Sequence, residues 1–222
     1  MTTTAGTAAF TEIPVLSYAR WQGSAADRNP FSDELAAAAQ AVSFRTLADH
    51  PHDWSGWQVV SNLPYSVGSP ILVELAQAAQ PPRSITVTLQ AEVVDRIRAA
   101  PDTSDYGVLT LLLARVYRFA GAFRIPSSCF FPAPDVESAC LRLEQRPVPL
   151  AEGAAATTYP QLVKLAFSQR RKRARKVLRS RWSEEALAHA WSRLGLDDNL
   201  RPETLSPETF AELARHLAPV AG

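Results

Sequence analysis

This sequence of 222 residues contains few glycines and few cysteines, and each shortage excludes a kind of site or cross-link. Its nine glycines lie more than ten residues apart, so no Gly-x-Gly turn is present. Cys129 and Cys140 are the only cysteines, too few for a disulfide framework or a zinc site. No apolar run approaches about 18 residues, and residues 1–9 lack the pattern of a secretory signal. We expect a cytoplasmic protein without a membrane segment.

The charge of the chain is concentrated in one basic segment. Hydrophobic residues make up 46% and charged residues 20%, which is typical of a globular protein, and the net charge is only +1. Residues 170–181 hold eight Lys or Arg residues and no acid, which leaves 15 basic and 22 acidic residues elsewhere. A solvated helix face is the ordinary interpretation of such a run. Eight cations without acids repel one another, however, which favours a polyanion such as RNA as the partner.

Hydrophobic patterns predict an α/β layer with parallel strands, because strands and helices alternate along the chain. The expected strands are a buried one at Trp57–Ser61 and two more at Arg83–Gln90 and Val136–Leu143. The expected helices are Ser69–Gln80 and Ala91–Ala100, and Val108–Phe119 is either a helix or a strand.

Composition divides the chain into three parts. Residues 1–45 are poorly specified, apart from a short helix expected at Ser32–Val42. Residues 46–148 form the α/β part, and an Ala/Gly/Thr linker follows at 150–158. Residues 159–222 are expected to be helical only: Pro160–Leu178, Glu184–Leu194 with a stop at Gly195, and a helix opened by Ser206-Pro207-Glu208.

The four residues Asn62-Leu63-Pro64-Tyr65, directly after the first expected strand, carry the groups for a chemical site. The carboxyl edge of a parallel sheet faces a crevice, where Asn62 offers a carbonyl oxygen. Pro64 has no N–H group and a fixed φ, so neighbouring carbonyl groups are held outward. Two acceptors could hold the amino group of a flipped-out base, with Tyr65 stacked on its ring. An ordinary Asn-Pro turn is the alternative.

Five blocks in the same order resemble the ribosomal RNA adenine N6-dimethyltransferases that act on small-subunit RNA. They are NLPYSVGSPIL (62–72), LQAEVVDRI with YGVLTLL (89–112), PSSCFFPAPDVESACLRL (126–143), AFSQRRKRARKVL (166–178) and RPETLSPETF (201–210). DNA adenine and glutamine methyltransferases use related loops, but usually with Pro in place of Leu63.

The resemblance implies a fold and a set of roles. The fold would be α/β, a Rossmann-like class I methyltransferase sheet that is incomplete at its N-terminus, followed by a small all-α C-terminal domain. Asn62 and the backbone at Pro64 would hold the adenine N6, in a catalytic loop that includes Leu63, with Tyr65 on one face of the base and Phe130 on the other. The reaction would be methyl transfer from S-adenosylmethionine without a metal. The RNA contacts implied are Arg170, Arg171, Lys172, Arg173, Arg175, Lys176 and Arg179.

The cofactor-binding half of such a fold is the part that the sequence does not display. No glycine-rich turn is present, Asn62 would lie beside the cofactor, and Asp49 is the candidate for a strand-end acid. We expect a monomer that dimethylates adenines of small-subunit ribosomal RNA or of a pre-ribosomal particle. The alternatives are a late start of the reading frame, a truncated gene, or a relative that binds RNA without catalysis.

Overall fold

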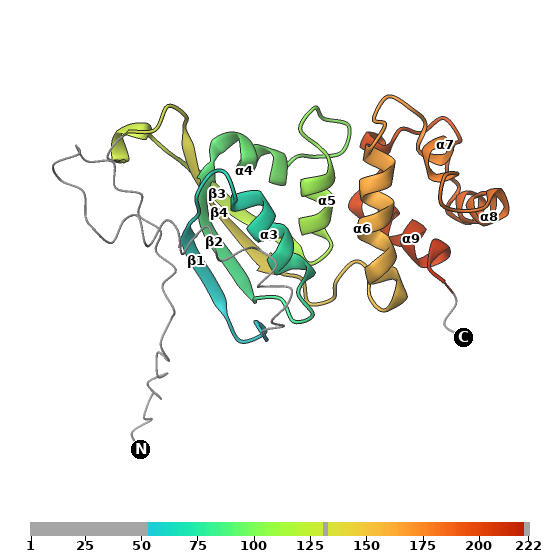
Figure 1. Ribbon diagram of the computed structural model, residues 1–222, viewed down its shortest axis with the longest axis horizontal. Helices are drawn as coiled ribbons and strands as arrows, with labels where there is room; N and C mark the ends of the chain where they lie inside the picture. The colour runs from blue at the N-terminus through green and yellow to red at the C-terminus, as the bar shows by residue number, and fades with distance from the viewer. Residues whose placement is uncertain (1–52, 131–132, 220–222) are drawn as a thin grey trace, which may run out of the picture.

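The computed structural model describes residues 53–130 and 133–219, which form a sheet flanked by helices and a helical region beyond it (Figure 1). The segment expected at 1–45, its helix at Ser32–Val42, and Asp49 lie outside the described residues. Within these two ranges the sheet has four strands in the order β1-β2-β4-β3. They are β1 Gln58–Asn62, β2 Ser84–Gln90, β3 Tyr117–Ile125 and β4 Ser138–Gln145. The expected α/β sheet followed by helices is confirmed.

The direction of the strands corrects the expectation of a parallel layer. Only β1 and β2 are parallel, and β4 runs antiparallel to both β2 and β3. Parallel neighbours need a crossover, which α3 (Gly68–Gln77) provides between β1 and β2. The described residues between β3 and β4 include no α-helix, only the short 3-10 helix η2 (Ser127–Cys129), and the two strands pair as a hairpin.

The first strand is less buried than its apolar sequence predicts. Exposed and half-buried residues alternate along β1, and Val60 is 74% exposed. The reason is position, because β1 is an edge strand of the described sheet and pairs on one side only, with β2. Central strand β2 instead alternates buried Ile85, Val87 and Leu89 with Thr and Gln residues.

The apolar stretch Val108–Phe119 contains parts of two elements. Helix α5 occupies Val108–Ala114, and β3 begins at Tyr117, so this strand extends beyond the expected range. The alternation that marks a strand is weak in β3 because nearly all of its residues are exposed or half-buried. Gly121 also interrupts the register there, at an irregularity between Phe119 and Gly121. Helix α4 (Ala91–Ile97) follows β2 directly, as expected.

The helical region begins earlier than expected and contains a break. Helix α6 runs from Ala154 to Phe167, because the Ala-rich residues assigned to a linker have high helix propensity. The expected helix Pro160–Leu178 is wrong: turns follow α6, and α7 occupies only Ala174–Leu178. The last two helices begin and end where their capping residues predict. Helix α8 (Glu184–Leu194) ends at Gly195, which is left-handed, and α9 (Pro207–Leu217) is capped by Ser206.

Helix α5 lies between the sheet and the helical region and packs on both (Figure 1). Leu109 and Leu113 belong to the core beneath the sheet, whereas Leu111 and Leu112 belong to the core formed with α6 and α9. A helix that is apolar on all sides is stable only when it is buried all round. None of the helices in the described part of the chain has the length and apolar character to span a bilayer.

Buried tyrosines add hydrogen bonds to this central packing. Tyr106 donates to the Leu205 carbonyl at 2.7 Å, and Tyr159 donates to the Leu111 carbonyl at 3.1 Å. Burial raises the pKa of both phenols, so they remain protonated donors at neutral pH. The 3-10 helix η3 (Pro202–Thr204) joins the same contact, because Asp102 donates its N–H to the Glu203 carbonyl at 2.8 Å.

Gly68→Ala is expected to destabilise the fold, because helix α3 starts very close to β2. A Cβ atom at Gly68 would lie 2.3 Å from Cδ2 of Leu89, which is only 1% exposed and has no room to move. We expect a loss of about 1–3 kcal/mol in the free energy of unfolding, measured by denaturant titration. Gly56→Ala is the control, since its Cβ meets nothing within 4 Å. Equal stability of both variants would contradict the close approach.

Candidate functional site

The segment Asn62-Leu63-Pro64-Tyr65 lies where β1 ends, at the carboxyl edge of the parallel pair. Asn62 is the last residue of β1 and pairs with Thr88. The Leu63 N–H donates to the Thr88 carbonyl at 3.2 Å, and the Leu63 side chain is buried. Beyond this bond the backbone leaves the sheet, so the exposed Asn62 side chain stands at the rim. Its amide makes no hydrogen bond with the residues that the structure describes.

The proline turn occupies one carbonyl group and leaves another available. The Val67 N–H donates to the Pro64 carbonyl at 3.1 Å, and the Ile71 N–H then donates to the Val67 carbonyl, which starts α3. The Leu63 carbonyl accepts no hydrogen bond within residues 53–130 and 133–219. The acceptor beside Asn62 that is open to a ligand is therefore the carbonyl of Leu63, whereas that of Pro64 already closes the turn.

A hydrogen bond across 73 residues of sequence fixes the Tyr65 ring. The Tyr65 hydroxyl and the Ser138 hydroxyl lie 2.5 Å apart, and Ser138 is fully buried at the first position of β4. Ser138 pairs with Gln90 and with Ile125, so it marks the same edge of the sheet at which β1 ends. Sequence reasoning did not identify Ser138. A signal for it existed, namely a hydroxyl at the start of an alternating apolar strand.

Phe130 lies in the connection between β3 and β4, which projects beyond the sheet (Figure 1). Its backbone is extended, its N–H donates to the Ser127 carbonyl at 3.1 Å, and its side chain is half-buried. This connection leaves the sheet at Ile125 and returns at Ser138, at the edge that carries Tyr65. Within the described residues no ring contact joins Phe130 to Tyr65. Closure of a base between them stays a prediction.

The remaining candidates for cofactor or metal binding lie mostly beyond the described residues. Asp49, the candidate for a strand-end acid beside the cofactor, is one of these. In the ranges 53–130 and 133–219, no group of three or more His, Cys, Asp or Glu side chains could hold a metal ion. Cys129 and Cys140 are free thiols.

The basic segment does not follow one helix, and its first cation serves the fold. Residues 170–173 lie in the turns between α6 and α7. The Arg170 guanidinium donates to the carbonyl groups of Ser104 at 3.2 Å and Tyr106 at 3.1 Å. It also lies 5.8 Å from the centre of the Phe167 ring. Arg170 therefore joins the helical region to the loop before α5.

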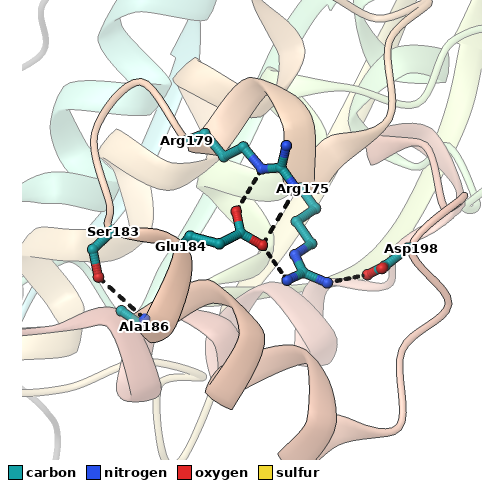
Figure 2. A network of polar contacts seen from close by, with 6 residues as sticks. All are labelled: Arg175, Arg179, Ser183, Glu184, Ala186 and Asp198. Atoms are coloured by element: carbon teal, nitrogen blue, oxygen red, sulfur yellow. Dashed lines mark hydrogen bonds and ion pairs between the residues drawn. The ribbon is translucent and has the colours of Figure 1, made fainter.

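Two further cations of the segment are neutralised by acids, which corrects the expectation that all eight are unpaired. Arg175 binds Glu184, and it also binds Asp198 at 2.5 Å (Figure 2). Arg179 binds Glu184 at 2.6 Å. Ser183 caps α8 by accepting the Ala186 N–H at 3.2 Å, and this cap holds Glu184 in position (Figure 2). These acids come from later in the chain and fold back onto α7.

Four cations of the segment face solvent without a partner among the described residues. They are exposed and make no side-chain hydrogen bond or ion pair there: Arg171, Lys172, Arg173 and Lys176. We call these four residues the free quartet. Three are consecutive in the turn and the fourth lies on α7, so the structure concentrates uncompensated charge there. The RNA contacts predicted from sequence remain a proposal for these residues.

Removing the Tyr65–Ser138 hydrogen bond is expected to lower stability in a coupled manner. Ser138→Ala and Tyr65→Phe should each cost about 1 kcal/mol in the free energy of unfolding. Each change removes the hydrogen bond and leaves the other, partly buried hydroxyl without a partner. The double variant should cost less than the sum, by a coupling energy of at least about 0.5 kcal/mol in a double-mutant cycle. Additive costs would show that the hydroxyl groups do not interact.

Neighbouring arginines in the basic segment are expected to behave differently. Arg170→Ala removes donors to two carbonyl groups and should lower the free energy of unfolding by about 1 kcal/mol. Arg171→Ala is the matched control, and we expect a change within about 0.5 kcal/mol, since its side chain is exposed and unpaired. Thermal unfolding of the two variants side by side measures the difference. A greater loss of stability in Arg171→Ala than in Arg170→Ala would contradict the structural role assigned to Arg170.

Solved structures of related fold confirm the architecture. A dimethyladenosine transferase from Plasmodium falciparum superposes with a TM-score of 0.59 and 17% identity, covering 70% of this chain and 64% of that one. The 23S rRNA methyltransferase ErmE superposes with a TM-score of 0.56 and 23% identity, covering 85% of this chain and 79% of that one. At these identities the likeness concerns the fold alone.

Sequence comparisons are more specific. Ribosomal RNA small subunit methyltransferase A of Nitrosospira multiformis is 37% identical over 159 residues, which are 72% of this chain and 60% of that protein. The protein of the same name from Bacillus cytotoxicus is 36% identical over 166 residues, 72% of this chain and 57% of that one. The chain thus spans less than two thirds of these relatives. The family model described as ribosomal RNA adenine dimethylase matches residues 33–218, and the chain belongs to this family.

Proposed function

We propose that this chain acts in the S-adenosylmethionine-dependent N6-dimethylation of adenine in small-subunit ribosomal RNA. The observation that carries the proposal is the grouping at the end of β1 in a chain of this family: a free Asn62 amide, a free Leu63 carbonyl and a Tyr65 ring held by Ser138. The names of both relatives reported above point to RNA methylation, and neither points to RNA binding alone.

Each of the three groups would bind a different part of a flipped-out adenine. The Asn62 side-chain oxygen and the Leu63 carbonyl accept the two N–H bonds of the amino group, which turns the N6 lone pair away from both. Stacking on Tyr65 is worth about 1–3 kcal/mol, which offsets the cost of unstacking the base from RNA. Phe130 closes the other face. The rate then depends on positioning and on a fixed polar environment rather than on a covalent intermediate.

The methyl donor fits one wall of the site that the described residues supply. In open α/β sheets ligands bind outside the carboxyl ends of the strands, which is where exposed Asn62 lies. When bound, S-adenosylmethionine would supply an electrophilic methyl group for the amino nitrogen that Asn62 and Leu63 hold. Groups for the methionine and ribose ends are not found among residues 53–130 and 133–219, and Asp49 remains a candidate outside them.

Domain roles follow from the same proposal. Residues 46–148 would form the α/β part that holds the base, and residues 159–222 the helical part that holds the RNA. The free quartet provides four cations for phosphate groups, while A-form RNA is recognised by shape and backbone rather than by base edges. We propose a monomer that meets ribosomal RNA or a pre-ribosomal particle in the cytoplasm.

Methylation of small-subunit RNA by the purified chain tests this function. We expect calorimetric binding of S-adenosylmethionine and dimethyladenine in the RNA by mass spectrometry. Asn62→Ala should reduce methyl transfer about 100-fold, because one of two acceptors for the amino group is lost. Asn199→Ala is the matched control, since Asn199 is also exposed but lies beyond α8.

Two results would contradict the proposal. The first is RNA binding without cofactor binding and without methyl transfer, which would make the chain an RNA-binding module. The second is an Asn62→Ala variant as active as Asn199→Ala, which would remove the amide from the site.

A further inference from the structure

A hollow lies in the helical region, away from the sheet edge that carries Tyr65. Its volume is about 560 Å³, and it is bounded by α6, by the connection between α7 and α8, and by the end of α9 with the residues that follow it. Its lining is Ala154, Thr157, Thr158, Gln161, Arg181, Trp182, Leu217 and Pro219. Among the residues that the structure describes, no acid contributes to this lining, and its one charged group is the Arg181 guanidinium.

Neutral groups hold Arg181 in place, as they do Arg170, whereas Arg175 and Arg179 bind acids. It donates to the Gln161 side-chain oxygen at 2.6 Å, and its guanidinium carbon lies 5.5 Å from the centre of the Trp182 ring. The Trp182 ring is itself anchored, because its indole N–H donates to the Leu217 carbonyl at 3.0 Å. A guanidinium has five N–H donors in a fixed fork, so most remain available to a ligand. The cation is thus oriented without being neutralised.

The chemistry of the lining fits an anion that carries a flat or apolar part. Arg181 binds a phosphate through charge-assisted hydrogen bonds, and the exposed Thr157 hydroxyl offers a further donor. Ala154 and Thr157 belong to the first turn of the 14-residue helix α6, whose positive end adds to the attraction. Trp182, Leu217 and Pro219 provide apolar wall on the other side. A nucleotide combines these two characters.

We propose that this hollow binds one nucleotide of the RNA substrate, with its phosphate on Arg181 and its base against the apolar wall. The proposal rests on the proposed function, which brings RNA to the helical region. It adds a defined contact to the general attraction of the free quartet. Arg181 belongs to the same basic segment as the quartet, so one RNA strand could engage both.

The test compares full-length variants by RNA affinity at several salt concentrations. A single-stranded oligoribonucleotide of mixed sequence is the probe, and an abasic ribose-phosphate oligomer is its counterpart without bases. We expect Arg181→Ala to weaken oligoribonucleotide binding about tenfold and to reduce the salt slope by about one. Arg181→Lys, which keeps the charge but loses the fork, should retain the slope and recover only part of the affinity.

Matched controls separate this contact from general electrostatics. Arg193→Ala removes an exposed arginine of α8 outside the hollow and should leave both quantities nearly unchanged. Intrinsic fluorescence should change with the oligoribonucleotide but much less with the abasic oligomer, and Trp182→Phe should abolish that change. Thermal unfolding verifies that each variant is folded.

The outcomes distinguish this site from the proposed function. Equal effects of Arg181→Ala and Arg193→Ala would overturn the nucleotide site, as would a fluorescence response to an acidic peptide in place of RNA. If substituting the whole free quartet by Gln weakens RNA binding while Arg181→Ala does not, only the nucleotide site fails. If RNA does not bind the wild-type chain at all, the proposed function fails first.

Discussion

The burial of α5 on all sides is the constraint on which the rest of the structure depends. Its leucines divide between two cores, so the sheet and the helical region cannot separate without exposing both. Tyr106 and Tyr159 strengthen the junction through hydrogen bonds to backbone carbonyl groups, and Arg170 extends it to the start of the basic segment. A single short helix therefore fixes how the edge of the sheet relates to the cations of the helical region.

That relation gives the proposed chemistry a geometric basis. A base extruded from RNA must reach Asn62 and Tyr65 while the RNA backbone is held elsewhere on the protein. The Tyr65 ring is held through its hydroxyl by Ser138, a fully buried residue at the start of β4. The loop after β1 is thus supported by the strand whose preceding connection carries Phe130. The two aromatic residues expected to enclose the base, Tyr65 and Phe130, are therefore both positioned by the start of β4.

The cations of the basic segment have different roles in the structure, although the sequence presents them as one run. Arg170 serves the junction, Arg175 and Arg179 bind Glu184 and Asp198, and Arg181 is held by a glutamine and a tryptophan. The free quartet makes no side-chain hydrogen bond or ion pair with the residues that the structure describes. The ion pairs on α7 decide which cations of the segment can meet phosphate, because Arg175 and Arg179 already bind acids.

The sequence by itself determined the local features: the helix caps at Ser206 and Gly195, the turn at Pro64, and the ordered blocks that identify the family. These depend on neighbouring residues, whose spacing is visible in one dimension. Only the tertiary structure decided that β4 is antiparallel, that Ser138 holds Tyr65 and that Glu184 neutralises Arg175. Such pairings join residues brought together by packing, because hydrogen bonds and ion pairs depend on distance in space rather than on distance along the chain.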